Sequence, residues 1–114
     1  MNGIEADKGG GESTGEAAGV LSVDYFEPHV GKIFSFRGTR YAFPLNKIVS
    51  DDRAFPDWIK RRPFMLIFRG PKEAEVLPEG LYVCEIAGGP AVTMHVAPIF
   101  TPQPDCQEYQ AAFN

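Results

Sequence analysis

Hydrophobic residues in this chain fall into short runs that glycine and proline separate. One run, Phe64–Phe68, is unbroken, with a proline before it and Gly70-Pro71 after it. A short apolar run between turn signals predicts a strand that is covered on both faces. Because successive strand residues point to opposite faces, Phe64, Leu66 and Phe68 would share one face of this strand. Met65 and Ile67 would lie on the other face.

The clearest hairpin signal surrounds Gly38-Thr39. A two-residue turn of type II′ there would place Phe36 opposite Tyr41 and Phe34 opposite Phe43. All four aromatic side chains would then share one face. A slip of one residue would divide them between two faces, so the pattern fixes the register.

A second hairpin is predicted from residues 81–86 and 91–97, joined by a loop at 87–90. Its expected register places Ile86 opposite Ala91. This register gives one apolar face and one mixed face: Leu81, Val83, Val92, Met94 and Val96 on the first, and Tyr82, Cys84, Thr93 and His95 on the second.

The remaining elements are a short helix, a proline-rich segment and a closing strand. Ser22 is a suitable N-cap, and Pro28 keeps the helix short. Prolines at 98, 102 and 104 are expected to break the second hairpin's last strand, and residues 107–113 alternate as a closing strand. The pattern therefore predicts an all-β, mainly antiparallel fold: a small barrel or sandwich of about six strands with one short N-terminal helix.

Composition indicates a domain boundary near residue 20 and argues against two classes of partner, nucleic acids and membranes. Residues 1–20 are rich in glycine and acids and predict a disordered tail, which leaves 21–114 as a single small β domain. A net charge of −4 argues against a nucleic-acid partner. No apolar run has the length of about 20 residues that crosses a bilayer, and no signal peptide is evident, so we expect no membrane partner and a cytoplasmic location.

Four segments together resemble a known family. They are Phe26-Glu-Pro-His-Val-Gly-Lys-Ile-Phe34, Arg62-Pro-Phe-Met-Leu-Ile-Phe-Arg-Gly-Pro71, Leu77-Pro-Glu-Gly-Leu-Tyr82 and Tyr109-Gln-Ala-Ala-Phe-Asn114. The chain from Tyr25 to Asn114 resembles DUF6916, a family of small bacterial proteins of unknown function. The resemblance carries over no catalytic or binding residue. It implies the same fold and an association with phage-tail-like assemblies.

Two groups of residues are candidates for function. Tyr82, Cys84 and His95 would share one face of the second hairpin, as a small-ligand site or a minor Cys–His catalytic site. In the alternative interpretation, Tyr82 and His95 form an ordinary packed cross-strand pair and have no role in binding or catalysis. Neither Cys84 nor Cys106 lies in a zinc-ligand spacing, so no metal and no cofactor is expected.

Trp58, with Phe55 and Ile59, forms the second group. In an otherwise polar loop these side chains would either anchor a protein interface or fold back to plug the barrel. The leading hypothesis is a non-enzymatic structural or protein-interaction module whose partner is another protein. The alternative is a ligand-binding barrel or minor enzyme that uses Tyr82, Cys84 and His95.

Overall fold

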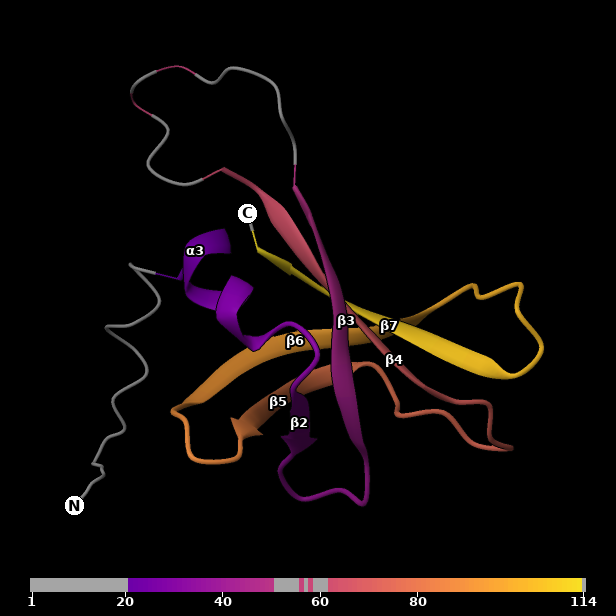
Figure 1. The fold of residues 1–114 in the computed structure, drawn as a ribbon. Coiled ribbons are helices and arrows are strands. Elements are labelled where there is room, and N and C mark those ends of the chain that lie inside the picture. Colours follow the sequence, from indigo (N-terminus) through magenta and orange to yellow (C-terminus); the bar gives the residue numbers. More distant parts are fainter. Residues whose placement is uncertain (1–20, 51–55, 57, 59–61, 114) are drawn as a thin grey trace.

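The computed structural model describes residues 21–50, 56, 58 and 62–113, and these form a closed six-stranded barrel with a short helical entry (Figure 1). The strand order is β2-β3-β4-β7-β6-β5, and every neighbouring pair is antiparallel. The all-β prediction is confirmed, with a barrel in place of a sandwich. The elements are α3 (Val23–Phe26), η2 (Glu27–His29), β2 (Ile33–Phe36), β3 (Ala42–Ser50), β4 (Phe64–Pro71), β5 (Gly80–Ile86), β6 (Ala91–Ile99) and β7 (Cys106–Phe113).

The helical entry closes one end of the barrel. Ser22 is the N-cap of α3, as predicted, although its side chain makes no capping hydrogen bond. Pro28 lies in the 3-10 turn η2 that follows directly. Phe26 is fully buried, and its ring lies 5.9 Å from Phe64 and 5.4 Å from Phe113. The short helix therefore packs one aromatic side chain between the start of β4 and the end of β7.

The first hairpin has the predicted register and a different turn. Phe34 lies opposite Phe43, and the Phe36 N–H donates to the Tyr41 carbonyl at 3.1 Å. The turn bond, however, runs from the Thr39 N–H to the Phe36 carbonyl, with Gly38 at a φ of 83°. The predicted two-residue type II′ turn is wrong because the Thr39 hydroxyl accepts the Tyr41 N–H at 3.0 Å and thereby stabilises a four-residue loop.

The second hairpin is displaced by one residue from its predicted register. Glu85, not Ile86, lies opposite Ala91. Ile86 is buried beside Phe34 of β2, and its carbonyl accepts the Gly89 N–H at 2.7 Å, which lengthens the loop by one residue. Leu81 consequently lies on the outer face and is 72% exposed. The predicted apolar face for β5 is wrong because Ile86, and not Leu81, is fixed inside.

β7 has the alternating pattern that the sequence predicts, whereas β6 does not end at Pro98 as predicted. Pro98 lies within β6 opposite Tyr109, whereas it was predicted to end the strand. Pairing between β5 and β6 stops at Val96, so beyond that point the missing N–H of Pro98 costs no bond to β5. In β7 the predicted alternation is confirmed, because Tyr109, Ala111 and Phe113 are all buried on one side of the strand.

Aromatic rings occupy the barrel interior. The Phe43 and Tyr109 rings stack with their centroids 4.6 Å apart, and Phe68 contacts Phe34 at 5.1 Å and Phe36 at 5.5 Å. Gly70 lies directly against this stack, where a Cβ atom would overlap the Phe43 ring. These contacts give the small barrel a filled core and make glycine necessary at position 70.

Candidate functional site

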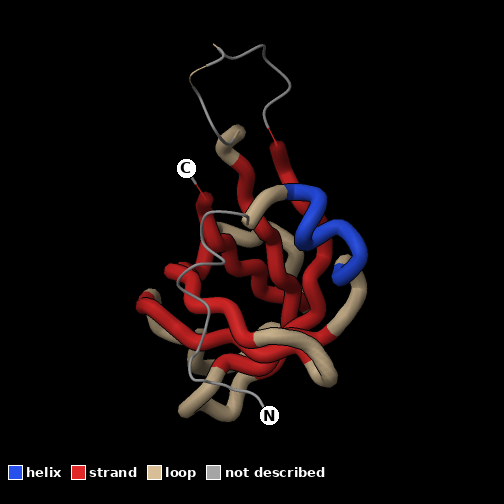
Figure 2. Tube along the Cα trace, turned by 90° about the vertical axis from the view of Figure 1, so that its left-hand side faces the viewer, coloured by secondary structure: helices blue, strands red, loops and turns tan. Residues whose placement is uncertain are grey.

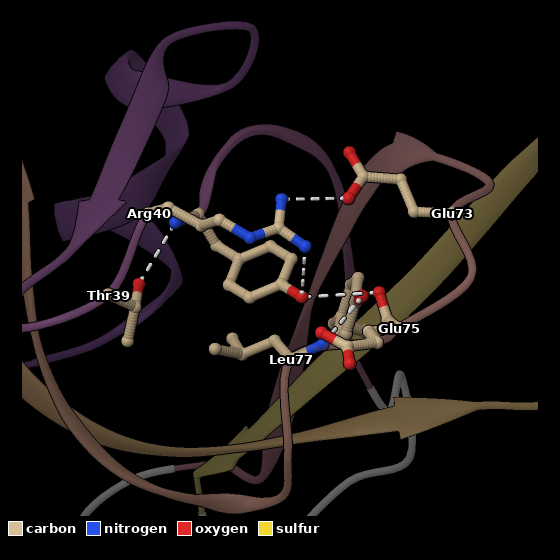
Figure 3. Close-up of polar contacts among 7 residues, drawn as sticks. Thr39, Arg40, Glu73, Glu75 and Leu77 are labelled. Atoms are coloured by element: carbon tan, nitrogen blue, oxygen red, sulfur yellow. Dashed lines mark hydrogen bonds and ion pairs between the residues drawn. The ribbon is translucent and has the colours of Figure 1, made fainter.

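Three tyrosine hydroxyls hold the connection between β4 and β5 against the barrel. Tyr41 donates to the Glu75 carbonyl at 3.2 Å, and Tyr82 donates to the Pro78 carbonyl at 2.6 Å. The Tyr109 hydroxyl accepts the buried Leu77 N–H at 3.1 Å. The Leu77 side chain is fully buried, and Figure 3 shows Leu77 and Glu75 among these contacts.

Arg40 joins the same group of contacts from the β2–β3 loop. Its guanidinium donates to Glu73 at 2.9 Å and to the Tyr41 hydroxyl at 2.9 Å (Figure 3). The hydrogen bond to Glu73 raises the pKa of Arg40, so this side chain stays charged. The group fastens two loops together, and each of these donors already has an acceptor within the chain.

Cys84, one of the predicted ligand-site residues, lies inside the barrel. Its side chain is fully buried, and its Sγ lies 3.7 Å from the Tyr82 carbonyl oxygen. Burial, with a smaller contribution from the charge of Glu85, raises the pKa of the Cys84 thiol to about 12. The thiol is therefore protonated at neutral pH, and a thiol is a far weaker nucleophile than a thiolate.

His95 lies on the opposite side of the sheet from Cys84. It is outside the barrel, opposite Leu81, and its Nε2 lies 3.0 Å from a carboxylate oxygen of Glu79. Tyr82 shares the inner face with Cys84, but its hydroxyl is bound to Pro78. The predicted grouping of Tyr82, Cys84 and His95 on one face is wrong because it depended on the displaced register.

Trp58 is exposed. It lies in the connection between β3 and β4, and 76% of its surface is accessible. This placement favours the interface interpretation of Trp58 and opposes the plug. Phe55 and Ile59, the two other residues of the predicted interface, lie outside the described residues, so their part stays a prediction.

Arginine side chains on the barrel surface form ion pairs with carboxylates of the same chain. Arg37 lies 2.7 Å from Glu85, and Arg69 lies 2.6 Å from Glu108, which is its direct cross-strand neighbour. These ion pairs join neighbouring parts of the barrel to each other.

Among residues 21–50, 56, 58 and 62–113 there is no group of three or more His, Cys, Asp or Glu side chains that could hold a metal ion.

One exposed aromatic side chain escaped the sequence reasoning. Phe100, which follows β6, is 89% exposed, and the prolines around it predict only a break in the strand. On the outer side of β4, by contrast, Met65 is half-buried and Ile67 is only 4% exposed, although both face away from the barrel interior. The unbroken run Phe64–Phe68 predicts apolar residues on both faces of β4.

In the part of the chain that the structure describes, no helix is long and apolar enough to span a membrane. No curated protein and no solved structure was found to match the chain. One family model does match it, that of DUF6916, described as a domain of unknown function, over residues 21–113. The match covers the whole barrel and its helical entry, and the chain therefore belongs to the DUF6916 family.

Proposed function

We propose that this protein is a non-enzymatic structural or protein-interaction module, an accessory component of a larger bacterial, phage-tail-like assembly. The observation that carries the proposal is the exposure of Trp58, the only tryptophan in the chain. Tryptophan is enriched among the few residues that supply most of the binding energy at protein interfaces. Burying such a side chain against a partner removes a large apolar area from water.

The filled interior supports a function at the surface. Small-ligand barrels leave room among their inward side chains, whereas rings from five of the six strands meet inside this one. The one inward thiol, Cys84, is buried and protonated. The described interior is therefore occupied by packed side chains, and we expect a partner to bind the outer surface of the barrel.

A protein partner fits the surface better than a nucleic acid. Arg37 and Arg40, the basic side chains at the tip of the first hairpin, are both engaged with carboxylates of the same chain. The chain as a whole carries a net charge of −4. Both cysteines are free thiols, which suits a location in the reducing cytoplasm.

Affinity capture from cells that express the chain natively tests the proposal. Wild type, Trp58→Ala and Leu81→Ala would be compared by quantitative mass spectrometry. Leu81 is the matched control because it is also a large apolar residue, 72% exposed, but lies on β5. We expect one partner enriched on wild type and Leu81→Ala, lost on Trp58→Ala, and bound again by purified wild type. A partner set unchanged in Trp58→Ala would contradict the proposal.

A further inference from the structure

β3 is longer than the strand that lies beside it in the barrel. β2 pairs with β3 only at residues 42–44. The last bonds between them are those of Leu45, whose N–H donates to the Lys32 carbonyl at 3.0 Å and whose carbonyl accepts the Gly31 N–H at 2.8 Å. Residues 46–50 continue beside β4 past β2, as Figure 1 shows. We define the free β3 edge as the side of residues 46–50 that is turned away from β4.

The backbone groups of Ile48 and Ser50 point toward the free β3 edge. Ile48 lies opposite Leu66 and Ser50 lies opposite Phe64, whose side chains are buried inside the barrel. Along a strand, the direction of the side chains and that of the backbone hydrogen-bonding groups alternate together. Leu45 is also buried, and its backbone groups point toward β2. The bulge after Leu45 shifts the alternation, so Ile48 and Ser50 repeat its orientation at a place where β2 is no longer beside them.

Within residues 21–50, 56, 58 and 62–113, no backbone hydrogen bond reaches the free β3 edge. The helix α3 lies close to β3, but its buried ring, Phe26, packs between Phe64 and Phe113 at the end of the barrel (Figure 2). Unpaired N–H and C=O groups on a strand edge are a template for another strand. A helix cannot pair with them, because its own backbone groups are bonded within the helix. The edge is therefore suited to an extended segment.

The side chains along this edge indicate the composition of such a segment. Lys47 and Val49 are exposed on the outer side, and Ile48 is half-buried against the core on the inner side. In the described part of the chain, no carboxylate forms an ion pair with Lys47. A strand with an apolar side chain beside Ile48 and an acidic one beside Lys47 would complement both sides. Because Ser50 leads into the connection that holds Trp58, one partner can reach the edge and Trp58 together.

We propose that an extended segment of the partner protein adds to the free β3 edge as a further strand, with an acidic residue beside Lys47. This inference rests on the proposed function and names the chemistry of its partner. The segment exchanges hydrogen bonds with Ile48 and Ser50 and extends the sheet of β3, β4 and β7 by one strand. A second copy of this chain is a poor occupant, because pairing two β3 edges brings Lys47 of both copies onto the same outer face.

Photo-crosslinking identifies the partner segment. A benzophenone amino acid would replace Val49, beside the free β3 edge, or Ala42, which is exposed on the same strand where β2 is paired with it. The full chain would carry it in cells that express the protein natively. Both replaced side chains are exposed, so neither replacement disturbs the core. We expect an adduct from position 49 and none from position 42, mapped by mass spectrometry to one segment of one protein.

Backbone methylation of a peptide then tests strand addition. A labelled peptide of the crosslinked segment would be titrated with the purified full chain, unmodified or N-methylated at every second residue in either of the two possible registers. One register blocks the N–H groups that face β3 and should weaken the affinity about tenfold or more. The other register methylates groups that face solvent and should leave the affinity unchanged. In the complex, amide exchange of Ile48 should become slower.

A charge reversal tests the acidic residue. Lys47→Glu should weaken binding of the unmodified peptide about threefold, as expected for one exposed ion pair. The matched control is Lys72→Glu, since Lys72 is an exposed lysine that follows the far end of β4. We expect Lys72→Glu to bind the peptide as wild type does. An affinity that Lys47→Glu leaves unchanged or raises would contradict an acidic segment at this edge.

Several results would overturn strand addition. They are an adduct from position 42 and not from 49, no adduct from either, a second copy of this chain or a lipid as the crosslinked species, equal effects of the two methylation registers, and unchanged exchange of the Ile48 amide. A partner lost with Trp58→Ala whose segment gives one of these results would leave the proposed function standing and remove this inference. A partner that adds to the edge but is retained by Trp58→Ala would contradict the part played by Trp58 and leave this inference standing.

Discussion

Burial of the Cys84 side chain couples one titration to the stability of the barrel. Its thiol has a usual pKa of 9.0, and burial raises that pKa to about 12 in the folded protein. Below pH 9 the thiol is protonated in both the folded and the unfolded chain, so it adds no pH dependence. Between these two pKa values only the unfolded chain ionises, which favours unfolding by about 1.4 kcal/mol for each pH unit.

Urea unfolding of wild type and Cys84→Ala at pH 8 and pH 10 would measure this effect. The wild type should lose about 1.4 kcal/mol more between the two pH values than the variant, because the two proteins differ only in the Cys84 thiol. Equal losses in the two proteins would show that the Cys84 thiol is solvated in the folded state.

Gly70 lets the Phe43 ring lie against β4. Gly70→Ala would place a methyl group in the volume of that ring, which also stacks against the Tyr109 ring. We expect a loss of about 1–3 kcal/mol in the free energy of unfolding. In a Phe43→Leu background the same substitution should cost clearly less, because the smaller side chain can move aside. Equal costs in the two backgrounds would mean that the ring and Gly70 do not touch.

At the scale of elements, the β4–β5 connection depends on tyrosine hydroxyls in unequal ways. Tyr109→Phe would leave the buried N–H of Leu77 without an acceptor, which costs about 1–3 kcal/mol. Tyr82→Phe would free the exposed Pro78 carbonyl, where water can replace the hydroxyl, so the cost should stay below about 0.5 kcal/mol. Chemical denaturation of both variants gives the comparison, and the reverse order would contradict the described burial.

The two hairpins show what sequence reasoning can and cannot establish about an element. In the first hairpin four aromatic residues share a face in only one register, so the pattern fixed the pairing even though the turn type was wrong. The second hairpin has an apolar set on each face of β5, with Leu81 on one and Ile86 on the other. Its register depends on a contact between Ile86 and β2, which is distant in sequence.

At the scale of the whole molecule, the fold class and the approximate number of strands followed from local patterns. The closure of the barrel did not, because it depends on pairing between strands that are far apart, such as β2 with β5 and β4 with β7. The candidate site could be predicted from the sequence even less well than the closure of the barrel. The grouping of Cys84 with His95 required a register accurate to one residue, and the exposure of Trp58 and Phe100 depends on where loops lie relative to the completed barrel.

The exposure of Trp58 underlies the proposed function, and its fluorescence measures that exposure directly. Because Trp58 is the only tryptophan, the emission spectrum of the purified monomer reports on this one side chain. We predict an emission maximum as far to the red as that of free N-acetyltryptophanamide and comparable quenching by acrylamide. A blue-shifted emission that resists acrylamide would place Trp58 inside the barrel and contradict the account of this protein as an interaction module.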